Sequence, residues 1–154
     1  MRYKAILFDM DGTLLDTLTD MVDAVNHILS VHGWPLRTTE EVRAFVGNGA
    51  RRLMERAVPP EVTDGDFEAV LTEYRDWYQT HNCVATAPYP GIPALLAALA
   101  KAGIKTAVVS NKPDATTKTL AARFFPGLPA FGQRDDVPPK PAPDLVFRAL
   151  ETLG

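Results

Sequence analysis

The sequence has almost no cysteine and no long apolar run, and each absence excludes a class of protein. Cys83 is the single cysteine among 154 residues, so we expect no internal disulfide and a reducing, cytoplasmic location. No stretch approaches the roughly 20 apolar residues that a membrane-spanning helix needs. The 16 basic and 19 acidic residues nearly balance, which gives no electrostatic reason to expect nucleic acid. We therefore expect neither a membrane nor a nucleic-acid partner.

What is present is an ordinary globular composition, 46% hydrophobic and 23% charged, with two kinds of periodicity. The apolar run from Tyr3 to Phe8 is typical of a strand buried on both faces. Residues 18–84 follow a helical period without a clear strand, and Thr38 with Glu41 predicts a capping box there. Further along we expect a helix that starts at Ile92 and closes at Gly103, then a strand over 104–109 and a helix over 113–124. A short strand over 130–133 and a last helix over 145–153 are expected to follow.

This order predicts an α/β fold, a Rossmann-like core of parallel strands with an inserted α-helical cap. The core is expected to be discontinuous, over residues 1–17 and 85–154. The cap is expected over residues 18–84.

Two carboxylates follow the first predicted strand, one residue apart, in FDMDGT. Gly12 permits a turn that would bring Asp9 and Asp11 into one pocket. A divalent cation would offset their repulsion, and one carboxylate can attack phosphorus while the other acts as acid and then base. The alternative is that these aspartates only cap or solvate a turn. Ser110 and Asn111 end the second predicted strand, at the edge where parallel sheets bind ligands.

Lys140 stands in PPKPAPD, between prolines that limit its backbone freedom and could hold it towards an anion. Alone, a lysine is usually a solvated charge, and a Ser-Asn pair is usually a turn or a helix cap. Here the signals from the aspartates, the Ser-Asn pair and the lysine coincide at one predicted rim of the sheet. We therefore expect a phosphate-binding site at that rim.

With these motifs the chain resembles the haloacid dehalogenase-like hydrolase superfamily. DMDGTLLD resembles its first motif, VVSN its second and the lysine of KPAPD its third, with a helical insert between the first two. Within the superfamily the chain is most similar to phosphoglycolate phosphatases, through VGNGARRLMERAV, PYPGI and VVSNKP. The resemblance extends over nearly all 154 residues.

The resemblance implies a Mg²⁺-dependent phosphatase of small phosphomonoesters, 2-phosphoglycolate foremost, that acts through an aspartyl phosphate. It implies that Asp9 is the nucleophile, that Asp11 is the general acid and base, and that Lys140 stabilises both Asp9 and the transferring group. The metal ligands would be the Asp9 carboxylate and the Asp11 backbone carbonyl. The implied phosphate-binding residues are Gly12, Thr13, Ser110, Asn111 and Lys140.

The predicted cap contains one candidate for substrate contact, the segment Gly47-Asn48-Gly49 with Arg51. Its glycines permit close approach of the backbone, and an arginine can pair with a substrate carboxylate. An ordinary turn between helices with a surface arginine is the alternative interpretation.

The superfamily's fourth motif, a strand ending in an acidic pair within GDxxxD, does not occur in this sequence. Its absence predicts an incomplete metal site, and it leaves the first strand as an unpaired sheet edge. A fragment of a longer protein is the interpretation we favour. The alternative is a chain whose edge is covered by a partner, and self-association through the edge is one candidate.

Three functions therefore stay open. The first is a phosphatase for a small phosphorylated metabolite, phosphoglycolate above all, impaired in this chain by the missing motif. The second is a sugar-phosphate phosphatase or phosphomutase with the same core. The third is a non-catalytic phosphate-binding or regulatory module.

Overall fold

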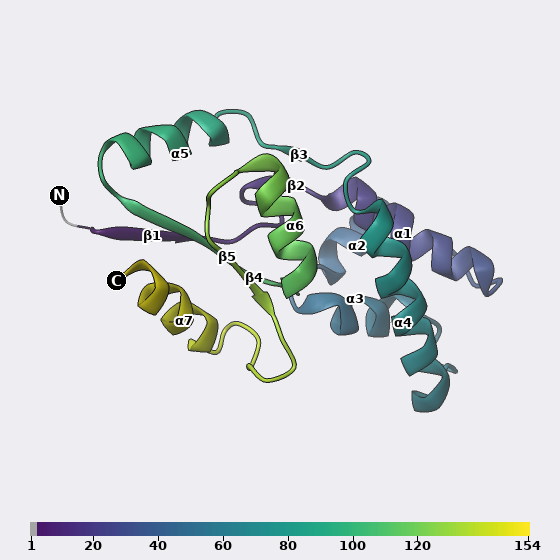
Figure 1. Cartoon of the computed structure of the whole chain (residues 1–154). Coiled ribbons are helices and arrows are strands. Elements are labelled where there is room, and N and C mark those ends of the chain that lie inside the picture. The colour runs from purple at the N-terminus through teal and green to yellow at the C-terminus, as the bar shows by residue number, and fades with distance from the viewer. Residues whose placement is uncertain (1–2) are drawn as a thin grey trace. The chain divides into compact units, whose positions relative to one another are not determined.

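The computed structural model describes residues 3–154, and the chain separates into two compact units (Figure 1). The first unit runs up to Asp16 and resumes over Ala87–Gly154. The second unit is Thr17–Thr86. The chain therefore leaves the first unit once and returns to it once.

The first unit is built on a three-stranded parallel sheet in the order β1-β4-β5. Ala5 lies opposite Lys105, and Phe8 lies opposite Val108. The α/β class and the parallel sheet that the sequence predicts are confirmed. The elements of this sheet and the helices around it are β1 (Ala5–Phe8), α5 (Ile92–Lys101), β4 (Lys105–Pro113), α6 (Asp114–Phe124), β5 (Ala130–Gln133) and α7 (Asp144–Leu153).

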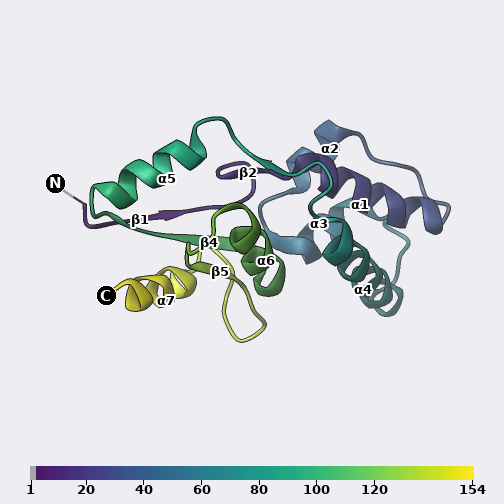
Figure 2. The same ribbon diagram turned by 45° about the horizontal axis from the view of Figure 1, so that its top comes forward.

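The two faces of this sheet are covered by different helices, and α5 and α7 lie on opposite sides of it (Figures 1 and 2). Leu145 and Ala149 of α7 pack in one buried cluster with Val109 of β4. Successive side chains of a strand point to opposite faces, so Gly132 belongs to the face opposite that of Phe131. A Cβ atom at Gly132 would lie only 2.5 Å from the Cα atom of the first residue of α6, which shows how closely that helix approaches β5.

β1 lies at an edge of the sheet, as the sequence predicts, and among residues 3–154 it pairs with β4 alone. All four of its residues are only half-buried, and α5 has no buried residue although it is largely apolar. Large apolar side chains are exposed on this unit at Tyr3, Leu95, Phe147 and Leu150. Self-association through the edge stays a prediction.

The structure corrects the expected end of the second strand. β4 continues to Pro113, so Ser110 and Asn111 lie inside the strand and are buried, whereas the sequence predicts that the strand ends at these two residues. The prediction is wrong because the apolar pattern stops at Val109 while the strand continues through polar residues. A second pair of strands, β2 (Leu15–Asp16) and β3 (Ala87–Pro88), is antiparallel and too short to show any periodicity in the sequence.

The second unit contains helices α1 (Leu18–Val31), α2 (Thr39–Phe45), α3 (Gly49–Ala57) and α4 (Asp64–His81). Thr38 is the N-cap residue of α2 and forms the predicted capping box with Glu41. Its N–H donates to the Glu41 carboxylate (2.7 Å), and its hydroxyl accepts from the Glu41 N–H (3.2 Å). The hydrogen bond from the Thr38 backbone lowers the pKa of Glu41. The buried core of the unit includes Val25, Leu29, Val42, Met54, Leu71 and Tyr74.

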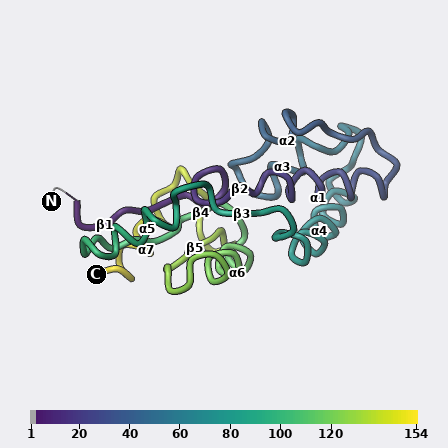
Figure 3. The backbone as a smooth tube through the Cα atoms, turned by 90° about the horizontal axis from the view of Figure 1, so that it is seen from above, coloured from purple at the N-terminus to yellow at the C-terminus, as the bar shows by residue number. Residues whose placement is uncertain are grey.

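A buried carboxylate joins the two ends of the second unit. Asp20, in the first turn of α1, is 1% exposed. It accepts hydrogen bonds from the backbone N–H groups of Val84 (3.1 Å), Ala85 (2.8 Å) and Thr86 (2.9 Å). The Thr86 hydroxyl donates a fourth, at 2.6 Å. Just outside these ends, β2 and β3 run side by side (Figure 3), so the chain enters and leaves the second unit at one place.

We predict that Asp20→Asn lowers the free energy of unfolding by about 2 to 4 kcal/mol. Both oxygens of the carboxylate accept hydrogen bonds, whereas the NH₂ of asparagine is a donor and would face other N–H donors without bonding to them. Urea unfolding followed by circular dichroism measures this. The matched control is Asp23→Asn, an exposed position of the same helix, for which a change below about 0.5 kcal/mol is expected. Equal effects of the two variants would contradict the role assigned to Asp20.

Candidate active site

A tight turn follows β1 and carries the residues of the first motif. The carbonyl of Met10 accepts the backbone N–H groups of Thr13 (3.2 Å), Leu14 (3.0 Å) and Leu15 (3.0 Å). Gly12 has φ +74°, a left-handed conformation that glycine adopts without strain. Its N–H in turn donates to the carbonyl of Leu15 at 3.0 Å. The turn that Gly12 was expected to permit is therefore present.

Asp9 lies directly after β1 and forms an ion pair with Lys140, which is 131 residues away in the chain. The Lys140 Nζ lies 2.9 Å from Asp9 Oδ1 and 2.7 Å from the carbonyl oxygen of Val109. The side chains of Asp9 and Lys140 are 45% and 26% exposed. Both groups of this pair are therefore accessible to solvent.

The amide side chain of Asn111 fixes the backbone of Lys140. Its Oδ1 accepts the Lys140 N–H at 2.7 Å, and its Nδ2 donates to the Lys140 carbonyl at 3.0 Å. This double hydrogen bond holds the backbone of the loop that carries Lys140 against β4. The structure thus gives the Asn111 side chain a positional task that the sequence did not predict.

A second lysine–aspartate pair lies beside the first motif. Lys112 donates from Nζ to Asp11 Oδ1 at 3.0 Å, and the side chains of Lys112 and Asp11 are only 3% and 14% exposed. Ser110 lies next to this pair, because its Oγ accepts the Lys112 N–H at 3.1 Å. Sequence reasoning missed Lys112, although the lysine stands in the motif VVSNKP. No signal in the sequence marks its burial, because the apolar pattern stops at Val109 while the strand continues to Pro113.

The structure thus connects the predicted site residues of the first unit in two groups. Asp9, Asn111 and Lys140 are joined by the first set of hydrogen bonds, and Asp11 and Ser110 are joined through Lys112. Gly12 and Thr13 lie exposed in the turn next to Asp11. The catalytic and phosphate-binding roles of all these residues stay predictions.

The candidate cap residues belong to the second unit. Gly47 and Gly49 have φ values of +117° and +85°, and Gly49 begins α3. Arg51 pairs with Glu68 of α4 at 2.8 Å, and this partner raises the pKa of Arg51 while the pKa of Glu68 is lowered. Asn48 Oδ1 accepts from Arg56 at 3.3 Å. The contact of this segment with a substrate stays a prediction.

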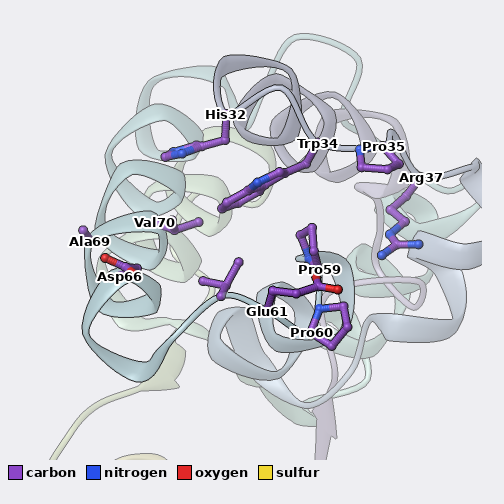
Figure 4. Close-up of a pocket in the computed structure, with 11 residues that line it drawn as sticks. His32, Trp34, Pro35, Arg37, Pro59, Pro60, Glu61, Asp66, Ala69 and Val70 are labelled. Carbon is purple, nitrogen blue, oxygen red and sulfur yellow. The ribbon is translucent and has the colours of Figure 1, made fainter.

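The second unit also contains a cavity of about 730 Å³ (Figure 4). Its wall includes Trp34, whose ring stacks on that of His32 with centroids 4.5 Å apart. The other residues that line the cavity are Pro35, Arg37, Pro59, Pro60, Glu61, Val62, Asp66, Ala69 and Val70. None of the site residues predicted from the sequence lines it.

Two features are absent from residues 3–154. No group of three or more histidine, cysteine, aspartate or glutamate side chains in this part of the chain is arranged to hold a metal ion. No helix within it combines the length and the apolar character needed to cross a membrane.

Comparison with known proteins identifies the family of the chain. Residues 3–154 match the family of haloacid dehalogenase-like hydrolases, and the chain belongs to that family. The family resemblance inferred from the motifs is therefore confirmed.

Two curated relatives share most of the chain. It is 44% identical to the N-acetylmuramic acid 6-phosphate phosphatase of Pseudomonas aeruginosa, over 100% of the chain and 70% of that protein. It is 34% identical to the phosphoglycolate phosphatase of Pseudomonas syringae pv. syringae, over 98% of the chain and 58% of that protein. The chain therefore spans only part of the length of each.

A solved structure is similar as well. The crystal structure of a predicted phosphoglycolate phosphatase from Haemophilus somnus matches with a TM-score of 0.89 at 27% identity. The match covers 99% of this chain and 72% of the other.

We predict that Asn111→Ala speeds hydrogen exchange of the Lys140 amide by about two- to tenfold, because that N–H loses its acceptor. Amide exchange followed by NMR measures this. Thr119→Ala, which removes a hydroxyl bonded only within α6, is the control and should leave the Lys140 amide unchanged. An unchanged rate in Asn111→Ala would show that the side chain does not hold the loop.

Proposed function

We propose that this protein is a phosphatase that hydrolyses small phosphomonoesters through an aspartyl phosphate. The observation that carries the proposal is the exposed Asp9 carboxylate paired with Lys140 at the carboxyl end of β1. Ligands of parallel sheets bind at this end, and a carboxylate there can act as a nucleophile towards phosphorus. The family membership and the phosphatase names of both curated relatives support the same activity.

The proposed reaction has two steps. An Asp9 oxygen attacks phosphorus, the ester P–O bond breaks, and the leaving oxygen takes a proton from Asp11. A water oxygen then attacks the aspartyl phosphate and loses a proton to Asp11, and the bond from phosphorus to the Asp9 oxygen breaks. Inorganic phosphate and the Asp9 carboxylate result. The Lys140 ammonium stabilises the negative charge on the transferring group throughout.

Phosphate binding is proposed for the turn and for the buried strand next to it. The Ser110 Oγ accepts the Lys112 N–H, which leaves its hydroxyl hydrogen able to donate to a phosphate oxygen. Thr13 lies exposed in the turn and offers its hydroxyl as a donor. Gly12 is exposed as well, and its lack of a side chain permits a phosphate to approach the turn closely. Asn111 is proposed to contribute through the Lys140 backbone that it holds.

Mg²⁺ is the cofactor that we propose, held by the Asp9 carboxylate and the Asp11 backbone carbonyl. The donor set suits this ion, which prefers oxygen ligands and is often bound by one or two carboxylates together with substrate phosphate and water. Asp9 has the accessible carboxylate that such a site needs. When bound, the ion would neutralise charge on the phosphoryl oxygens.

Two substrates are supported by the relatives, and both carry a carboxylate as well as a phosphate ester. The relative that is 44% identical is named for N-acetylmuramic acid 6-phosphate, and the one at 34% is named for phosphoglycolate. We propose the amino-sugar phosphate as the preferred substrate and 2-phosphoglycolate as the second. The segment Gly47-Asn48-Gly49 with Arg51 is the proposed substrate contact of the cap.

The activity predicts phosphate release from both esters in Mg²⁺ and its loss in Asp9→Asn by about 10³-fold or more, because an amide is no nucleophile towards phosphorus. Phosphate is measured colorimetrically, with and without EDTA. Asp135→Asn removes an exposed carboxylate from the loop before Lys140, and this control should keep full activity. Phosphate bound without release would instead support the non-catalytic module.

The proposed order of substrates predicts that kcat/KM for N-acetylmuramic acid 6-phosphate is about tenfold or more above that for 2-phosphoglycolate. Differences in contacts within a binding pocket change kcat/KM by about this factor. N-acetylglucosamine 6-phosphate, which lacks the lactyl carboxylate, is the matched control substrate and should be poorer. The reverse order would make phosphoglycolate the substrate. Isomerisation of a sugar phosphate without phosphate release would identify a mutase.

A further inference from the structure

We propose that Lys112 is a positioning residue for the proton transfers of Asp11, a role that rests on the phosphatase activity proposed above. Lysine is seldom fully buried, yet Lys112 is 5% exposed in β4. An ammonium group in such surroundings is costly unless a counter-charge compensates it. Asp11 supplies that charge, with Oδ1 at 3.0 Å from the Lys112 Nζ.

The backbone of Lys112 is fixed from several sides. Its N–H donates to Ser110 Oγ at 3.1 Å, and its carbonyl accepts from Thr117 Oγ1 at 3.2 Å. Across the sheet, a Cβ atom at Gly132 would lie only 2.7 Å from that carbonyl oxygen. The strand therefore has little room to shift at this point, and the Lys112 side chain starts from a fixed position.

The backbone of Asp11 is fixed as well. It bridges to Leu15 across the turn, where the Gly12 N–H donates to the Leu15 carbonyl at 3.0 Å. A carboxylate on a fixed backbone still rotates about its own bonds. The hydrogen bond from Lys112 restricts that rotation, because it holds one of the two oxygens in place.

The orientation of Asp11 matters because the same carboxyl group gives a proton in the first step and takes one in the second. Both transfers require the oxygen to lie within hydrogen-bond reach of the reacting group. Lys140 has a different task, since it pairs with Asp9 at an exposed place where substrate arrives. Lys112 therefore acts through Asp11 and not by touching the substrate.

The leaving group separates the two steps. An alkoxide needs the proton from Asp11 in order to leave, whereas para-nitrophenolate leaves without it. The first step with para-nitrophenyl phosphate should therefore tolerate a misplaced Asp11, while hydrolysis of the aspartyl phosphate should not. A chain without Lys112 would then release one equivalent of para-nitrophenolate quickly and the rest slowly.

The experiment compares wild type with Lys112→Met, which keeps the length of the side chain, and with Lys112→Arg, which keeps the charge. The control is Lys118→Met, since Lys118 forms a lysine–aspartate pair with Asp114 on the exposed surface of α6. Steady-state and rapid-mixing kinetics are measured in Mg²⁺ with 2-phosphoglycolate and with para-nitrophenyl phosphate. Circular dichroism confirms that each variant folds.

For Lys112→Met we expect kcat with 2-phosphoglycolate to fall about 10- to 100-fold, because part of general acid–base catalysis depends on the orientation of the Asp11 carboxyl group. KM should change less than about twofold. With para-nitrophenyl phosphate we expect the one-equivalent burst. Lys112→Arg should recover part of kcat, and Lys118→Met should behave as wild type. Unchanged kinetics, or an equal loss on both substrates without a burst, would overturn the proposal.

A second readout does not depend on turnover. In protein labelled with ¹³C at aspartate carboxyl groups, the Asp11 resonance should move in Lys112→Met and stay in place in Lys118→Met. If wild type released no phosphate from any ester, the proposed function would fail, and this resonance would still test the contact. A resonance that stays in place in Lys112→Met would refute the positioning role of Lys112 in either case.

Discussion

The repulsion between Asp9 and Asp11 is the constraint on which the rest of the first unit depends. Two carboxylates one residue apart after a strand need compensating charge, and the fold supplies a lysine for each. One lysine comes from the next strand of the sheet and the other from the loop before α7. Meeting this requirement brings three distant segments of the chain to one end of the sheet.

The two ion pairs differ in their exposure to solvent and therefore in what they contribute to stability. The Asp9–Lys140 pair is half exposed, so water and salt screen it and it adds little to stability. The side chains of the Asp11–Lys112 pair are almost completely shielded from solvent. A buried ion pair seldom stabilises a fold more than well-packed apolar residues of similar volume would. Such a pair is better explained by the geometry that it imposes than by the stability that it adds. Accessibility and rigidity are thus divided between two neighbouring aspartates.

The sequence predicted the parts of this site that local pattern encodes. Asp9, Asp11 and Lys140 stand out because carboxylates after an apolar run and a lysine between prolines are locally unusual. Lys112 does not stand out in the sequence, because it follows the polar residues Ser110 and Asn111, and the periodicity of apolar residues cannot show that a lysine there is buried. The hydrogen bonds of Asn111 and of Asp20 join residues far apart in the chain, and no local signal exists for such pairs.

The closure made by Asp20 has a consequence for how the chain can fold. Pairing of β1 with β4 joins residues as distant as Ala5 and Lys105, and closing so long a loop is entropically unfavourable and slow. The hydrogen bonds of Asp20 hold residues 84–86 close to the start of the second unit. Once they have formed, the second unit lengthens that loop only by the short distance between its own two ends. An insert that folds on itself in this way lets the sheet form as though its first two strands were close in the chain.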